Sequence, residues 1–152
     1  MKRRRSAAVV VGLVGALSLS ACFAVPPVDT SFETRIPEAL EASAYGYTEA
    51  YAEKAIDGFS TVLAVGMQTD STEVPTSQLE ETIAIIVDGN TLGGDQLRLT
   101  IRTADEFLSL DDQAIELGAD PIAESGTTLT IHMDEARAIA AAAAAAASAT
   151  AG

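Results

Sequence analysis

The sequence has few of the side chains that carry enzyme chemistry. Its 152 residues include one cysteine, one histidine and no tryptophan. A single histidine excludes metal sites built from several imidazoles and leaves only one imidazole for a catalytic triad. Ser60 follows Gly58 as in a nucleophile elbow, but Val62 stands where that motif needs its second glycine. We therefore expect no enzyme, no catalytic residue, no metal site and no cofactor.

Positive charge is scarce as well. Four of the nine Lys and Arg residues lie at positions 2–5, and all 22 Asp and Glu residues follow position 21. Without residues 1–21 the chain has five cations against 22 carboxylates, a formal charge of −17. Nucleic-acid binding depends on Lys and Arg neutralising phosphates, so we expect no nucleic-acid partner.

The N-terminus has the pattern of an export signal. The cations at 2–5 precede an apolar segment, Ala7–Leu19, which is shorter than the roughly 20 residues of a membrane-spanning helix. The segment ends in Leu19-Ser20-Ala21-Cys22. These residues resemble the lipobox of bacterial prolipoproteins, in which an aliphatic residue and two small residues precede a cysteine.

The resemblance implies that residues 1–21 are a signal peptide and that Cys22 carries a diacylglycerol as the first residue of the mature chain. The lipid would hold the protein on the outer side of a bacterial cell membrane, anchored and not spanning. The only thiol would then be acylated, so no disulfide is expected. The lipobox covers the N-terminus alone, and the rest of the chain resembles small envelope lipoproteins only in its general character.

Composition divides the remaining chain into three parts. Residues 22–36 contain Pro26 and Pro27 and are predicted to be a flexible linker, because paired prolines favour extended chain. Residues 37–134 are predicted to be a single small domain. Residues 135–152 include an unbroken alanine run and are predicted to be a low-complexity tail, helical or disordered.

Apolar spacing predicts a helix that starts at Pro37 and stops at Gly58. Its apolar stripe would place Tyr47 and Tyr51 in the core. A second helix is predicted to open at a capping box of Ser77 and Glu80 and to end at Gly89. A short third helix is predicted over 110–117, with Ser109 as its cap.

Three segments alternate apolar and polar residues and are predicted to be strands: 59–68, 97–102 and 128–133. We expect Phe59 to lie on the buried face of the first strand. Helices alternate with these half-buried strands, which favours an α/β two-layer sandwich of about three strands with helices on one face. An α+β fold with an antiparallel sheet is the alternative.

The candidate ligand-binding residues are Arg98, Arg102, Thr130 and His132. Alternation places Arg98 and Arg102 on one face of a strand, and Thr130 and His132 on the matching face of another. If the strands are neighbours, forked guanidinium contacts could hold a carboxylate or phosphate. Alternatively, the arginines solvate an exposed face and pair with nearby Asp and Glu, which is the interpretation we favour.

Together these patterns predict a lipid-anchored extracytoplasmic envelope lipoprotein. Its partners would be the membrane, through the lipid on Cys22, and an envelope protein bound by a non-catalytic interaction or assembly domain. The alternative is a domain that binds a small anionic ligand at the face containing Arg98, Arg102 and His132.

Overall fold

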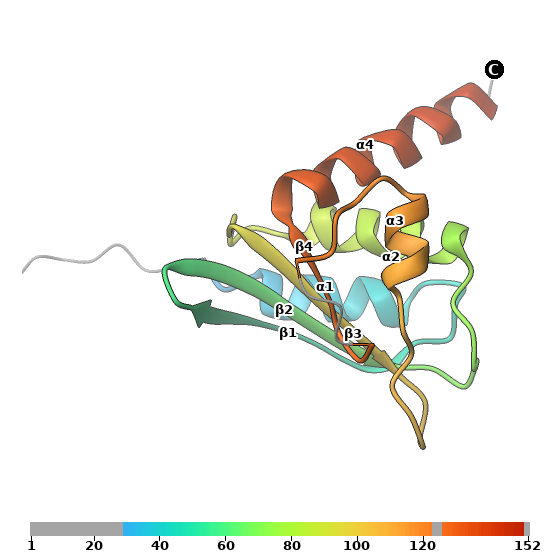
Figure 1. Ribbon diagram of the computed structural model, residues 1–152, viewed down its shortest axis with the longest axis horizontal. Coiled ribbons are helices and arrows are strands. Elements are labelled where there is room, and N and C mark those ends of the chain that lie inside the picture. Colours follow the sequence, from blue (N-terminus) through green and yellow to red (C-terminus); the bar gives the residue numbers. More distant parts are fainter. Residues whose placement is uncertain (1–28, 123–125, 151–152) are drawn as a thin grey trace, which may run out of the picture.

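The computed structural model describes residues 29–122 and 126–150. In these residues a sheet of four strands is covered on one face by four helices (Figure 1). The elements in chain order are α1 (Phe32–Glu41), β1 (Thr48–Asp57), β2 (Ser60–Gln68), α2 (Thr76–Gly89), β3 (Gln96–Arg102), α3 (Asp111–Glu116), β4 (Leu129–His132) and α4 (Met133–Thr150). The predicted signal peptide, Cys22 and the start of the predicted linker lie outside the described residues.

The sheet is mixed, with the strand order β1-β2-β3-β4. β1 and β2 form an antiparallel hairpin, β2 runs parallel to β3, and β3 is antiparallel to β4. The parallel pair is joined through α2, as a parallel connection requires a crossover. The predicted α/β class is confirmed, although the sheet has four strands where about three were expected, and it is not fully antiparallel.

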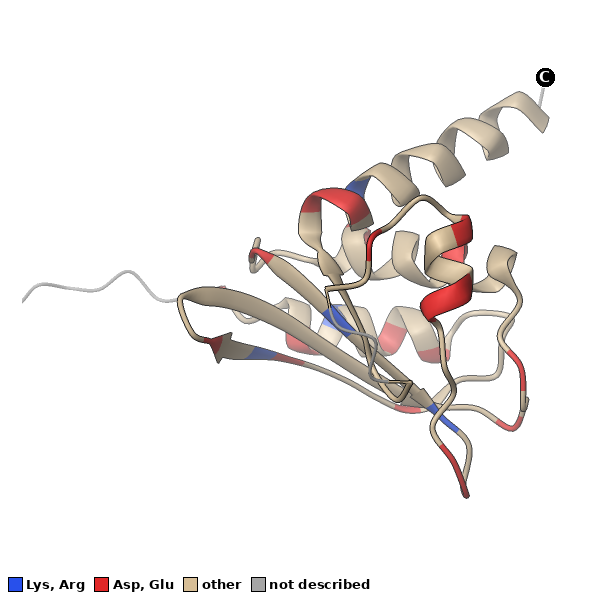
Figure 2. Ribbon diagram, viewed as in Figure 1, with Lys and Arg blue, Asp and Glu red and all other residues tan. Residues whose placement is uncertain are grey.

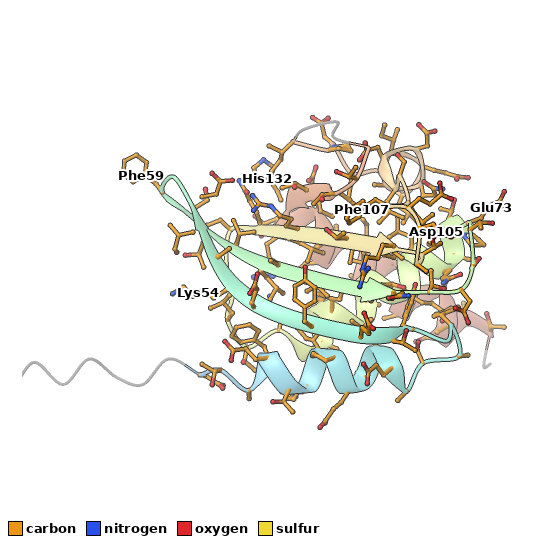
Figure 3. All side chains as sticks on the ribbon, turned by 90° about the horizontal axis from the view of Figure 1, so that it is seen from below. Lys54, Phe59, Glu73, Asp105, Phe107 and His132 are labelled. Atoms are coloured by element: carbon orange, nitrogen blue, oxygen red, sulfur yellow. The ribbon has the colours of Figure 1, made fainter. Side chains whose placement is uncertain are left out.

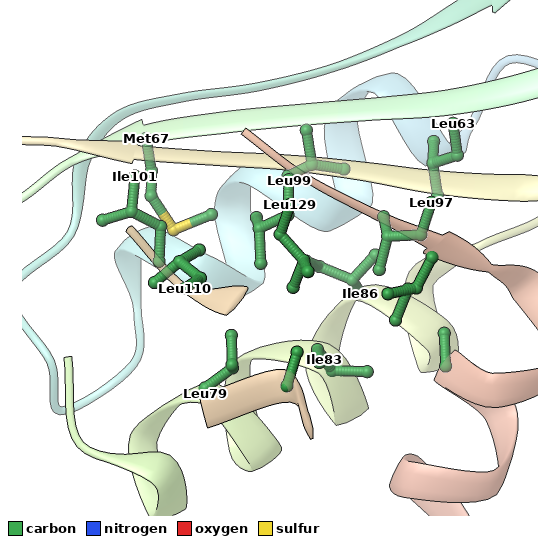
Figure 4. Close-up of a cluster of buried hydrophobic side chains, with 14 of the residues drawn as sticks. Leu63, Met67, Leu79, Ile83, Ile86, Leu97, Leu99, Ile101, Leu110 and Leu129 are labelled. Atoms are coloured by element: carbon green, nitrogen blue, oxygen red, sulfur yellow. The ribbon is translucent and has the colours of Figure 1, made fainter. Parts of the chain in front are cut away.

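The core lies between the sheet and the helices (Figure 4). Every second residue of β3 is buried, which is the alternation expected of a strand with one covered face. These residues meet the apolar stripes of the helices in a single cluster. Its fully buried members include Phe32, Ile36, Leu40, Leu63, Leu79, Ile83, Ile86, Leu97, Leu99, Ile101 and Ile131.

The predicted helix over 37–58 is wrong. α1 begins at Phe32, with Pro37 inside it, and a strand occupies positions 48–57. The helix begins before the predicted start at Pro37 because Phe32 and Ile36 pack into the core. Gly46, with φ of 67°, lies in the loop between the two elements, in a conformation that a right-handed helix cannot contain. Residues 48–57 then pair with β2 as a hairpin, although their apolar residues have helical spacing.

Two aromatic residues predicted to be buried are exposed. Phe59 lies in the hairpin turn, not within β2, and is fully exposed. Tyr51 is 49 % exposed, because β1 turns it away from the helices. Tyr47, in contrast, is buried in the core as predicted.

The helix ends also differ from the predictions. α2 begins at Thr76 after Pro75, without a side-chain cap, so Ser77 and Glu80 do not form the expected capping box. α3 follows Leu110, and Ser109 does not cap it. α4 contributes Ala136 and Ile139 to the core. The packed body is therefore longer than the predicted 37–134 at both ends.

Candidate functional site

The candidate site lies on the sheet face that the helices of the described chain leave uncovered, which we call the outer face (Figure 3). Apart from Gln68 at its end, the central strand β2 has only small or apolar residues on this face, so longer side chains from its neighbours can lie across it. The outer face is formed by Tyr51 and Glu53 of β1, Val62, Ala64 and Gly66 of β2, Arg98, Thr100 and Arg102 of β3, and Thr130 and His132 of β4.

All four residues of the predicted ligand site lie on the outer face. β3 and β4 are neighbours, and Thr130 stands opposite Arg98 in their register. His132 stands opposite Gln96 at the end of β4, and its backbone N–H donates a hydrogen bond to Glu135 Oε2 at 2.9 Å. The sheet thus brings the four residues to one surface, and their role in ligand binding stays a prediction.

Both arginines of β3 are already paired with carboxylates. Arg98 Nη2 lies 2.7 Å from Asp57 Oδ2, and Arg102 Nη2 lies 2.8 Å from Glu49 Oε2. Each pair joins β3 to β1 across β2. Partly exposed pairs of this kind contribute about 0–1 kcal/mol to stability. In the part of the chain that the structure describes, cations are sparse and carboxylates are spread over the helices and loops (Figure 2). Each contact uses one nitrogen of a guanidinium that has five N–H donors, so an anion would have to bind beside the paired carboxylate or displace it.

A β-bulge positions Glu49. The register between β1 and β2 shifts between Thr48 and Tyr51, so β1 contains one extra residue there. Glu49 has φ of 50°, in the left-handed region where bulges commonly use glycine. The backbone N–H of Ala50 donates to Glu41 Oε1 at 3.1 Å, which ties the bulge to the end of α1. Glu49, whose backbone conformation is unfavourable, thus provides the carboxylate that pairs with Arg102.

Next to this bulge the outer face is hollowed by a pocket of about 350 Å³. Its rim contains two half-exposed aromatic rings, from Tyr51 and Phe107. The Arg102–Glu49 ion pair and the Thr100 hydroxyl supply its polar groups. The pocket therefore offers apolar surface and hydrogen-bonding groups together, with the two formal charges cancelling. Its lining is completed by Gly66 and Met67.

Gly66 determines where the Tyr51 ring lies. A Cβ atom at Gly66 would stand 2.3 Å from Cε1 of Tyr51, which no real contact allows. The glycine thus lets the ring rest directly on the backbone of β2. Any larger residue at this position would push the ring out of its place at the pocket.

Phe107 is held by the turn that follows β3. Phe107 forms a bridge with Arg102, and the N–H of the next residue, Leu108, donates to the carbonyl of Ile101 at 2.9 Å. Leu108 is buried, whereas the ring of Phe107 is 53 % exposed. The buried neighbour fixes the backbone, so the exposed ring stays at the rim of the pocket.

Sequence patterns identified only Arg102 of this pocket. Tyr51 was missed because it fitted the stripe of a helix that does not form. Glu49 was missed because a bulge has no reliable sequence signal. Phe107 did carry a signal, since it is a lone aromatic residue in a polar turn after a strand.

The other two tyrosines have structural roles. Tyr47 Oη is hydrogen-bonded to Thr82 Oγ1 at 2.9 Å and accepts from Gln78 Nε2 at 3.0 Å, and burial raises its pKa. Tyr45 donates to the Glu81 carboxylate. Burial of the phenol, and then this hydrogen bond, raise the pKa of Tyr45 to about 12. Both tyrosines therefore join the segment before β1 to α2.

Two larger hollows lie on the helical side. The one between α2 and α4, of about 740 Å³, is walled by alanine methyl groups, Glu80, Glu81 and Asp88. The one beside α3, of about 450 Å³, is lined by loop residues, by Thr76 at the start of α2 and by Gln113 of α3. Among the described residues that line them, neither has an aromatic ring or a cation, so neither offers the combination of contacts found on the outer face.

The described residues contain no group of three or more His, Cys, Asp or Glu side chains that could hold a metal ion. Within the same residues, no helix has the length and apolar character needed to cross a membrane. No protein-family model, curated protein or solved structure matches this chain.

Proposed function

We propose that this protein is an extracytoplasmic lipoprotein anchored to the cell membrane by a lipid on Cys22. The support is the order of signals at the N-terminus: cations, a short apolar segment and the lipobox residues before the only cysteine. Two or three acyl chains bind a bilayer far more firmly than one, since each buried CH₂ contributes about 0.8 kcal/mol.

The anchor is tested by Cys22→Ser expressed in its bacterial host. The wild-type protein should fractionate with membranes, and its intact mass should match residues 22–152 plus a lipid. The variant should keep its leader and lose the added lipid mass. If the two proteins have the same processing, lipid content and fractionation, Cys22 is not the anchor.

We propose further that the described domain is a non-catalytic interaction module, whose outer face binds a segment of another envelope protein. The pocket beside the β-bulge carries this proposal, because two exposed aromatic rings flank a paired guanidinium and carboxylate. An apolar side chain of the partner would fill the space between Tyr51 and Phe107. Its backbone polar groups would hydrogen-bond to Thr100, Arg102 and Glu49, which can donate or accept without a net charge.

In-cell photocrosslinking tests this proposal. A photoreactive amino acid replaces Phe107 in one strain and Ile115 in another. Ile115 is a suitable control because it is similarly exposed, at 54 %, but lies on α3, away from the outer face. We expect a discrete adduct with one protein from position 107 and none of that size from position 115.

The outcome also separates partner binding from the alternative. Crosslinking at 107 that yields no protein adduct, or the same adducts as 115, contradicts the interaction proposal. A small anionic ligand held by Arg98 and Arg102 would instead raise the melting temperature of the purified protein in inorganic phosphate. Arg98→Gln combined with Arg102→Gln should then abolish that shift while leaving the fold intact.

A further inference from the structure

The turn of the β1–β2 hairpin exposes apolar side chains that the fold does not require. Phe59 is fully exposed at the turn, and Ile56 beside it is 64 % exposed. Gly58, with φ of 60°, supplies the left-handed conformation that the turn needs. The turn geometry therefore does not require an aromatic residue at position 59. Turn residues are normally small and polar. A phenylalanine in this position therefore points to a contact outside the domain.

The surroundings of the turn are suited to a lipid surface. Lys54 and Ile56 lie on the face of β1 that meets the helices elsewhere, but this end of the hairpin extends beyond their cover (Figures 1 and 3). Lys54 makes no ion pair among the described residues. Of the carboxylates beside the turn, that of Asp57 is paired with Arg98, and that of Asp95 accepts a hydrogen bond from the backbone N–H of Thr61 at 2.7 Å. The turn thus presents two apolar side chains and the ammonium group of Lys54.

The chain enters the domain at the same end. The hairpin turn and the start of α1 lie at one end of the long axis, and Phe107 lies toward the other (Figures 1 and 3). Six residues lie between Cys22 and Asp29, and the seven steps from one to the other span at most about 3.6 Å each in an extended chain, or about 25 Å in total. A lipid on Cys22 would therefore keep this end of the domain near the bilayer.

We propose that the hairpin turn is a second membrane contact, in which Phe59 and Ile56 enter the lipid headgroup region and Lys54 faces the lipid phosphates. Phenylalanine is among the apolar residues with which interfacial segments enter the boundary between headgroups and acyl chains, and a long Lys side chain can extend from an apolar surface to the phosphates. The contact rests on the proposed anchoring at Cys22. It would orient the domain with the pocket of the outer face directed away from the membrane.

The test uses the chain from Cys22 to Gly152. A thiol-reactive reagent attaches one acyl chain to Cys22, the only cysteine, so the result does not depend on acylation in cells. Phe59→Trp introduces a single tryptophan at the turn, and Phe107→Trp is the matched control on the sheet, away from the turn (Figure 3). On phosphatidylcholine vesicles, the emission of the Phe59→Trp variant should shift to shorter wavelength and be quenched by brominated lipids. The emission of the Phe107→Trp variant should not change.

The binding strength supplies a second readout. One acyl chain binds bilayers reversibly and marginally, so a contribution from the turn is measurable. Phe59→Ser combined with Ile56→Ser should weaken vesicle binding about tenfold, whereas Phe107→Ser should not. Equal binding of these variants and the wild type would overturn the proposal. The proposal would also be overturned if the emission of the Phe59→Trp variant shifted to shorter wavelength at high protein concentration without vesicles. That result would indicate contact between two copies of the chain.

Discussion

At the scale of single residues, Glu49 combines an ion pair with an unfavourable backbone conformation. Glu49→Ala removes the carboxylate from Arg102 and keeps a non-glycine residue at φ of 50°. Glu49→Gly removes the same carboxylate and relieves the backbone. We expect urea denaturation to show the Gly variant more stable than the Ala variant by about 1 kcal/mol. Equal stabilities would mean that the bulge is not strained at this position.

Gly66 permits a second prediction at this scale. Gly66→Ala should displace the Tyr51 ring, because the new Cβ would occupy its place. The cost to folding should be small, within about 1 kcal/mol, since an exposed ring can rotate away and alanine is better than glycine in a strand. Thermal unfolding checks the stability, and crosslinking from position 107 checks the site. A loss of several kcal/mol would show that Gly66 serves the fold and not the pocket.

Ala64→Gly is the matched control for that substitution. It exchanges the same two residue types at the neighbouring outward position of β2, away from Tyr51. It should cost about 0.5–1 kcal/mol of stability and leave crosslinking from position 107 unchanged.

At the scale of elements, Tyr45 connects the segment before β1 to α2 through the carboxylate of Glu81. The pKa of Tyr45 is raised from 10.0 to about 12 in the folded protein, so the unfolded chain releases this proton first as pH rises. The free energy of unfolding should therefore be insensitive to this group below about pH 10 and should fall between about pH 10 and 12. Denaturation at a series of alkaline pH values checks this.

Tyr45→Phe should flatten part of that decline. Burial also raises the pKa of Tyr47, so some alkaline destabilisation should remain in the variant. At neutral pH the substitution should cost less than about 1 kcal/mol, because the lost hydrogen bond is exposed to solvent. An unchanged slope in the variant would mean that burial and the hydrogen bond to Glu81 do not raise the pKa of Tyr45 in the folded protein.

The elements that sequence patterns predicted well are those whose burial follows a simple period. β3 alternates buried and half-buried residues along its whole length, and α2 buries Leu79, Ile83 and Ile86 at helical spacing. β1 could not be predicted in this way, because it is an edge strand and most of its residues are exposed. Its position depends on pairing with β2, which is a tertiary interaction.

The candidate site was predictable only in part, for the same reason. Alternation along β3 was enough to place Arg98 and Arg102 together on one face. The pocket also needs a bulge at Glu49, the approach of Tyr51 to Gly66 and the turn that carries Phe107. These depend on which strands are neighbours and in which register, and local spacing does not contain that information.

At the scale of the whole molecule, the two exposed features lie toward opposite ends of the long axis. Phe59 is at the end where the described chain begins, and Phe107 lies toward the other end (Figure 3). An anchor at Cys22 would bring the first end to the bilayer and leave the pocket accessible to a partner. The acidic surface favours this arrangement, because a domain of this charge is repelled by anionic headgroups and would not lie flat on them.

Photocrosslinking from position 107 in intact cells tests the proposed binding site most directly when the wild-type background is compared with Gly66→Ala. We expect one discrete protein adduct in the wild type and its loss in the variant, although the variant folds and remains in the membrane fraction. An adduct that persists at full yield in Gly66→Ala would contradict the claim that the pocket beside Tyr51 is the binding site.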